Sequence, residues 1–133
     1  LLRRNLGGRI RRRPLGSVLI TGTGQLRKTH ALKRILHVVS VRAEPLKTVT
    51  PGEALGDYVR DVIRAAEGYN RRLLTSRRAR LASMLVPMFG TGMAGRHPEE
   101  VTDLLVDGLI RGVAAIRVKG EPRLRKVCLL AYT

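Results

Sequence analysis

Apolar residues in this chain fall into short compact runs and longer stretches with helical spacing. Four short apolar runs predict strands, at residues 17–21, 35–41, 82–88 and 126–132, and the run 35–41 is rich in β-branched residues. Two stretches repeat apolar residues every three to four positions and predict amphipathic helices, over about 51–74 and 98–118. The order of elements is therefore strand, strand, helix, strand, helix, strand.

The first residues of both predicted helices carry start signals. Thr50 can cap the first helix, Pro51 suits its first turn, and Glu53 has the spacing of a capping box. Pro98, followed by two carboxylates, opens the second helix in the way the helix dipole favours. Gly68 is the weak point of the first helix.

Alternation of apolar strands with amphipathic helices predicts an α/β fold with a mainly parallel or mixed sheet and helices on both faces. The run 35–41 is the best candidate for a central strand covered on both faces. Residues 1–15 form a basic lead-in with several glycines, and residues 16–133 form one domain. In such sheets, ligands bind at the carboxyl ends of the strands.

Charge adds a class of partner to this picture. Lys and Arg number 26 against 10 Asp and Glu, which gives a formal charge of +16. Two arginine clusters stand out: Arg3, Arg4, Arg9, Arg11, Arg12 and Arg13, and then Arg71, Arg72, Arg77, Arg78 and Arg80. Nucleic acid or a diphosphate is the natural partner of such a surface, and a solvated basic face is the alternative. No aromatic residue lies inside either cluster, so the stacking platform of single-strand binders is missing.

The remaining composition limits which class of protein and which cellular location are expected. No apolar run approaches the roughly 18 to 20 residues that a membrane span needs, so no membrane partner is expected. Cys128 is the single cysteine, which excludes an intramolecular disulfide and a Cys-rich zinc site. The chain begins at Leu1 with no secretory signal, so we expect a fragment of a longer, cytoplasmic protein.

The segment most informative about function follows the predicted strand 82–88. Its glycines have the spacing Gly90-x-Gly92-x-x-Gly95, and the second predicted helix comes directly after them. Exposed amides in such a turn, together with the positive end of a helix, form an anion cradle. It is not a Walker A loop, because no Gly-Lys-Ser/Thr follows, and the acidic partner of a dinucleotide fingerprint is lacking downstream. A purely structural connection is the alternative.

The segment resembles the second ligand loop of macro domains, the ADP-ribose-binding α/β/α modules. Three further pieces agree in order: residues 16–21 (GSVLIT), 33–39 (KRILHVV) and 127–132 (VCLLAY) are similar to successive strands of that family. The overall pattern is also similar to macro-like domains of bacterial multidomain defence or signalling proteins. The resemblance covers residues 16–133 and implies a three-layer α/β/α macro-like mixed sheet, incomplete at its amino terminus.

The resemblance also implies a site. Its diphosphate-binding loop would be formed by Gly90, Thr91, Gly92, Met93, Ala94 and Gly95. Its ribose and adenine groove would be bordered by Met88, Phe89, Tyr132 and Thr133. Core packing is the alternative for Phe89, and a half-buried strand-end tyrosine is the alternative for Tyr132. The expected ligand is ADP-ribose, a related nucleotide diphosphate or an ADP-ribosylated protein, with no cofactor and no metal.

The chain also departs from the family. The early strand with its adenine-binding Asp and the Asn-rich turn around the distal ribose are not found, and Ala94 replaces a frequent aromatic residue. Residues for an ADP-ribosyl hydrolase are not visible, so we expect a binding module. A basic nucleic-acid-binding or assembly domain with a vestigial pocket is the alternative. A sheet without its first strands would expose an unpaired edge, to which the missing segment or another chain could associate.

Other reactive residue types predict structural roles. His37 lies in a predicted strand and is expected to be a hydrogen-bonded core histidine, while His97, at a helix start, could assist anion binding. Cys128 is expected to be an inert buried thiol. Asp57 and Asp61 share a helix face with arginines, which indicates surface charge pairing and not acid–base catalysis.

Overall fold

The computed structural model confirms an α/β chain and has the elements in the predicted order. It describes residues 13–40, 42–43, 48–49, 54–73, 77–88 and 97–130. Its strands are β1 (Val18–Thr21), β2 (Ile35–Val38), β3 (Arg42–Ala43), β4 (Thr48–Val49), β5 (Ser83–Pro87) and β6 (Lys126–Leu130). Its helices are α2 (Leu26–Thr29), α3 (Ala54–Arg72), the short 3-10 helix η1 (Arg77–Ala79) and α4 (Pro98–Arg117). The predicted capping box at Thr50 lies outside the described residues.

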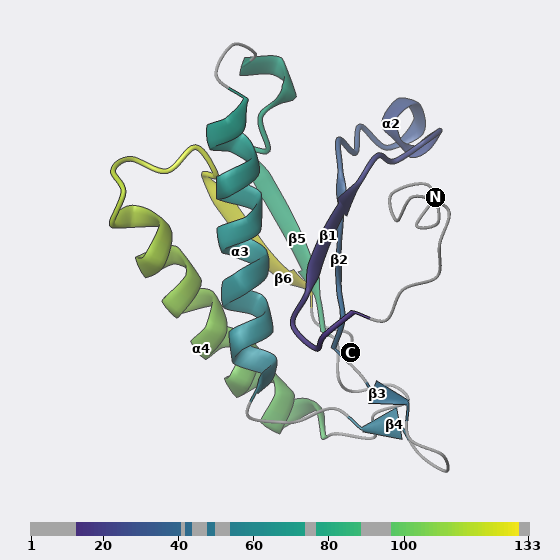
Figure 1. Cartoon of the computed structure of the whole chain (residues 1–133), viewed down its shortest axis with the longest axis vertical. Coiled ribbons are helices and arrows are strands. Elements are labelled where there is room, and N and C mark those ends of the chain that lie inside the picture. Colours follow the sequence, from purple (N-terminus) through teal and green to yellow (C-terminus); the bar gives the residue numbers. More distant parts are fainter. Residues whose placement is uncertain are drawn as a thin grey trace.

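Helix α3 is the central element of the described fold. It packs along α4 on one side and contacts the β1–β2 hairpin on the other, with β5 and β6 behind it (Figure 1). Its apolar stripe is fully buried, and its core members are Leu55, Val59, Ile63 and Ala66. The helix runs through Gly68 without a break, because its long buried face stabilises it more than one glycine costs.

Two helices approach each other closely at glycines. A Cβ built on Gly108 of α4 would lie 2.7 Å from the Cα of Gly56 on α3, and one on Gly112 would lie 2.8 Å from the Cδ1 of Ile63. Both distances are shorter than van der Waals contact, and at Gly108 the obstructing atoms are backbone, so only glycine fits there. The apolar spacing of α4 did not reveal this crossing, because glycine carries no hydrophobic signal.

Strands β5 and β6 are parallel, and α4 connects them. Ser83 pairs with Lys126 and Pro87 with Leu130, so the two strands begin and end together. Met84 and Val86 on β5, and Val127 and Leu129 on β6, pack against the core formed with the two helices. This strand–helix–strand unit is the parallel arrangement that the sequence pattern predicts.

Strands β1 and β2 form a separate antiparallel hairpin. The register places Leu19 opposite His37 and Thr21 opposite Ile35, and the short helix α2 lies in the connection between the two strands. β3 and β4 form a third, two-residue antiparallel pair. Among the described strands β2 pairs only with β1 and is half-buried, so the prediction of a central strand covered on both faces is not met there.

Helices α3 and α4 pack on the same face of the β5–β6 pair, whereas the sequence pattern predicts helices on both faces. Leu85 on β5 and Leu130 on β6 lie on the opposite face, with exposed fractions of 62% and 38%. Within the described residues, no helix is both long enough and apolar enough to cross a lipid bilayer.

Candidate functional site

The strand–helix–strand unit determines where the Gly-rich segment begins and ends. β5 ends at Pro87 and α4 begins at Pro98, so residues 89–96 connect the carboxyl end of β5 to the amino end of α4. β6 is parallel to β5 and ends at Leu130, so the chain leaves β6 at the same edge. Because ligands of α/β sheets bind at carboxyl ends of strands, this edge is the candidate site.

Most of the predicted site residues lie outside the described residues, so their roles stay predictions. These are the diphosphate-loop residues Gly90, Thr91, Gly92, Met93, Ala94 and Gly95, and the groove residues Phe89, Tyr132 and Thr133. Met88 is described. It directly follows β5, packs partly buried against the core, and lies with its Sδ 3.9 Å from the Thr102 hydroxyl oxygen of α4.

The amino-terminal ends of β5 and β6 are tied to α3 by two buried polar side chains. The Glu67 carboxylate, 1% exposed, accepts hydrogen bonds from the amides of Arg123 (2.9 Å) and Leu124 (2.9 Å) just before β6. Asn70, fully buried, bonds both the amide (2.6 Å) and the carbonyl (2.8 Å) of Leu81 just before β5. These side chains fix the two strands at the edge opposite the candidate site.

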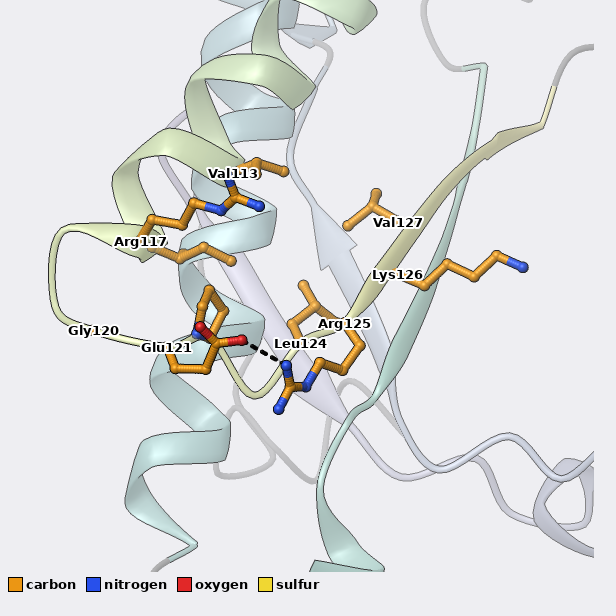
Figure 2. Close-up of a pocket in the computed structure, with 10 residues that line it drawn as sticks. Val113, Arg117, Gly120, Glu121, Leu124, Arg125, Lys126 and Val127 are labelled. Atoms are coloured by element: carbon orange, nitrogen blue, oxygen red, sulfur yellow. Dashed lines mark hydrogen bonds and ion pairs between the residues drawn. The ribbon is translucent and has the colours of Figure 1, made fainter.

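A hollow of about 400 Å³ lies at this opposite edge, between the end of α4 and the start of β6 (Figure 2). Arg117, Arg125 and Lys126 line it, and Glu121 is its single carboxylate. The Arg125 Nη1 lies 2.6 Å from Glu121 Oε1, and both side chains are largely exposed. The hollow is at the amino end of β6, away from the edge where the fold favours ligands.

A cleft of about 760 Å³ lies between the β1–β2 hairpin and α3, and its lining is cationic. Arg34, Arg64 and Arg72 line it, and no carboxylate does. Arg34 lies over the ring of Tyr69, with 5.6 Å from its Cζ to the ring centroid. Arg64 has a distant partner, with Asp61 Oδ1 at 3.8 Å from its Nη1. The cleft therefore combines three arginines and one aromatic ring with a lining that holds no carboxylate.

The sequence analysis did not find this cleft. It grouped Arg72 with its neighbour Arg71, but Arg71 pairs with the buried Glu67 (Nε–Oε1 3.5 Å). Arg64, Tyr69 and Arg72 lie on one side of α3. Arg34 directly precedes β2. The helical spacing of Arg64, Tyr69 and Arg72 was the available signal in the sequence. The position of Arg34 beside them could be found only from the tertiary structure.

His37 has the hydrogen bond that the sequence predicts, whereas Cys128 is less buried than predicted. His37 is half-buried, and its Nε2 lies 2.9 Å from the Thr21 hydroxyl. Cys128 is a free thiol, half-buried on β6. Within the described ranges, no group of three or more His, Cys, Asp or Glu side chains could bind a metal ion.

Asp57 and Asp61 belong to a charged network across α3 and α4. Arg111 of α4 donates a hydrogen bond to Asp57 Oδ1 at 2.7 Å, and Arg60 contacts both Asp57 (3.2 Å) and Asp61 (2.9 Å). The hydrogen bond from Arg111, assisted by the charge of Arg60, lowers the pKa of Asp57, and partial desolvation opposes this. The ion pairs confirm the predicted surface charge pairing of the two carboxylates.

Comparison of the chain with models of protein families, with curated proteins and with solved structures gives no match.

Proposed function

We propose that this chain binds a nucleotide diphosphate of the ADP-ribose type at the carboxyl edge of β5 and β6. The observation that carries the proposal is the parallel β5–α4–β6 unit, which connects the Gly-rich segment 89–96 directly to the start of a 20-residue helix. A helix amino terminus has uncompensated N–H groups and a positive dipole end, which favour phosphate. The overall charge of +16 supports an anionic ligand.

The proposal includes the family resemblance as its structural frame. A three-layer macro-like α/β/α fold would place the diphosphate on the amides of residues 90–95, with Met88 and Phe89 on one side of the groove and Tyr132 on the other. The ligand would be free ADP-ribose, a related nucleotide, or the ADP-ribose group of a modified protein. The activity proposed is binding.

Calorimetry with ADP-ribose tests the proposal. The native chain should bind with a dissociation constant below about 1 mM, equivalent to roughly 4 kcal/mol. Gly92→Asp adds a negative charge and a side chain to the proposed loop and should weaken binding at least about tenfold. Ala114→Asp adds the same charge at an exposed position of α4 and should leave affinity unchanged. Equal affinity of native chain and Gly92→Asp, or no heat from folded protein, would contradict the proposal.

A second candidate function is favoured by the cationic cleft between the hairpin and α3. Three arginines and Tyr69 line a cleft without a carboxylate, which suits the phosphates and bases of a single-stranded nucleic acid. This arrangement supplies an aromatic surface beside arginines, which the sequence did not indicate. Three phosphate contacts should give a slope of about −2 for log affinity against log salt with a single strand.

Polarisation of a labelled oligo-dT separates the two functions. Replacing the three cleft arginines (Arg34, Arg64 and Arg72) by Gln should abolish the salt-dependent binding. A control that replaces three exposed cations elsewhere (Arg27, Arg117 and Lys119) by Gln removes the same charge and should weaken binding only slightly. Oligonucleotide binding that is insensitive to Gly92→Asp and is lost in the cleft variant would assign nucleic acid to the cleft. Equal losses of affinity in both triple variants would show that binding depends only on the overall charge of the protein.

A further inference from the structure

Two of the three described sheets, β1–β2 and β5–β6, have facing edges that are unpaired among the described strands. β2 pairs only with β1, and β5 pairs only with β6, within the part of the chain that the structure describes. A groove of about 580 Å³ lies between these edges, lined by β2, β5 and the residues that precede each strand. Val59 and Val62 of α3 also line it, so the groove has an apolar helical floor between two strand edges.

On the β2 side, the hydrogen bonds to β1 show which backbone groups face the groove. The Val39 amide donates to the Ser17 carbonyl (3.0 Å), and the Val39 carbonyl accepts from the Gly16 amide (2.7 Å). Backbone groups of alternate residues in a strand point to opposite sides. Leu36 and Val38 therefore present their N–H and C=O groups to the groove.

On the β5 side, the same alternation applies. The Ala82 carbonyl accepts hydrogen bonds from the amide of Lys126 (3.1 Å), so it faces β6. Ser83 and Leu85 then present their backbone groups to the groove. Pro87, which has no N–H to donate, is next in this alternation, a position where a strand tolerates proline.

The two strands enter the groove from the same end. Lys33, just before β2, donates through its Nζ to the carbonyl of Arg80, just before β5, at 2.7 Å. β2 and β5 also run in the same direction in Figure 1. A strand inserted parallel to both would therefore find donors and acceptors on its two edges and valines below it.

Size and charge specify the occupant further. At about 3.3 Å per residue, 4.8 Å between strands and 10 Å between layers, a four-residue strand occupies roughly 600 Å³. This volume is close to that of the groove. Lys33 and Arg34 line the groove, and no carboxylate does, so its amino-terminal end favours an acidic residue.

We propose that the groove between β2 and β5 binds an extended segment of a partner polypeptide as a parallel β-strand, with a carboxylate preceding its apolar residues. Bound in this way, the segment joins the two sheets into one mixed sheet of the order β1, β2, partner strand, β5, β6. Unpaired edges are otherwise a hazard for aggregation, which such a partner would remove. This proposal does not depend on the nucleotide site.

The test uses the full chain and a synthetic probe, acetyl-Glu-Val-Thr-Val-Thr-Val-amide, with a fluorophore at its carboxyl end. Its valines recur every second residue to face the floor of the groove. Fluorescence polarisation should show saturable binding tighter than about 1 mM. The same peptide with N-methyl groups on alternate amides loses the hydrogen bonds of one edge and should bind at least about tenfold more weakly.

Two matched pairs examine direction and charge. A peptide with its Glu moved to the carboxyl end should bind more weakly, because Lys33 lies at the amino-terminal end of the groove. Lys33→Glu should weaken the native probe about fivefold, the effect of roughly 1 kcal/mol at an exposed ion pair. Lys28→Glu, at an exposed position on α2 outside the groove, should have no effect.

Three outcomes would overturn the proposal. Equal affinity for the native and N-methylated peptides would show that strand edges are not used. Failure of the folded chain to bind the probe at about 1 mM would show that the groove accepts no strand. A dimer in sedimentation that the probe dissociates would assign the groove to a second copy of the chain.

Discussion

Two regions that rest on the same helix differ in how they are attached to it. The β5–α4–β6 unit is joined to α3 by a glycine crossing and by two buried polar side chains, Glu67 and Asn70. The β1–β2 hairpin contacts α3 mainly through half-buried apolar residues, including Leu36 and Val38. The contrast indicates that the first region unfolds with the core, whereas the hairpin can open at lower free energy.

The comparison also explains where function is expected. Glu67 and Asn70 of α3 hold β5 and β6 at their amino-terminal ends, and this fixes the position of the carboxyl ends of the two strands. The hairpin borders both the cationic cleft and the strand-sized groove, which are places where a bound partner would add the contacts that the hairpin lacks. Binding at either place should stabilise the hairpin more than the core.

The largest effect should come from the helix crossing. Gly108→Ala places a methyl group against the backbone of Gly56, which cannot move without separating the helices. We expect the free energy of unfolding to fall by about 3 kcal/mol or more in urea denaturation. Gly68→Ala, whose Cβ would meet only the end of Arg72 at 3.9 Å, should instead stabilise the chain by about 0.5–1 kcal/mol. Equal effects of the two variants would show that the helices do not cross at these glycines.

The second-largest effect should come from removing the Glu67 carboxylate, which holds the start of β6 to α3. Glu67→Ala leaves the buried amides of Arg123 and Leu124 without an acceptor, and we expect a loss of about 2–3 kcal/mol. Hydrogen exchange should accelerate first in β6. Glu121→Ala, at an exposed ion pair beside Arg125, should cost less than about 1 kcal/mol. A Glu67 variant as stable as native protein would contradict the stabilising role of these hydrogen bonds.

The hairpin gives a smaller and more local effect. Leu36→Ala removes a half-buried side chain that packs against the core, so we expect a loss of about 1–2 kcal/mol. Hydrogen exchange should show faster exchange of amides in β1 and β2 with little change in β5 and β6. Uniform acceleration in all four strands would show that the two regions unfold as one unit.

The smallest effect concerns the ion pairs between α3 and α4. The lowered pKa of Asp57 means that its stabilisation is complete above the unfolded value near pH 4 and is lost as pH falls through the folded value. Because Asp57 is 45% exposed, solvent screening limits the gain to about 0.5 kcal/mol. Asp57→Asn should remove that part of the stability at pH 7, and its effect should shrink as the pH falls below the unfolded value, as measured by urea unfolding.

The sequence predicted the two long helices and four of the strands because its apolar spacing changes clearly between compact runs and a period of 3.6, but it did not predict the short elements α2, β3, β4 and η1. The buried helix stripe of α3 and the strand–helix–strand order were both apparent from that spacing. The roles of Glu67 and Asn70 were not, because a polar residue on a helix is expected to face solvent until a backbone needs it.

The sequence also did not reveal how the strands pair with one another. Nothing in the run 35–41 distinguishes a central strand from one with an unpaired inner edge, because the same apolar residues suit both. The cationic cleft combined residues from α3 with Arg34 near β2, which are 30 or more positions apart in the sequence. The candidate nucleotide site was predicted from glycine spacing and the family resemblance, and the structure adds that the strands β5 and β6 are parallel.

Amide chemical shifts during an ADP-ribose titration test the central proposal most directly. The account predicts that the largest changes fall at the residues bordering the carboxyl edge, such as Met88, Val101 and Leu130, together with residues 89–96. Leu81 and Leu124, at the clamped amino-terminal edge, should change little. Shifts confined to the cleft residues around Tyr69, or no shifts at saturating ligand, would contradict nucleotide recognition at this edge.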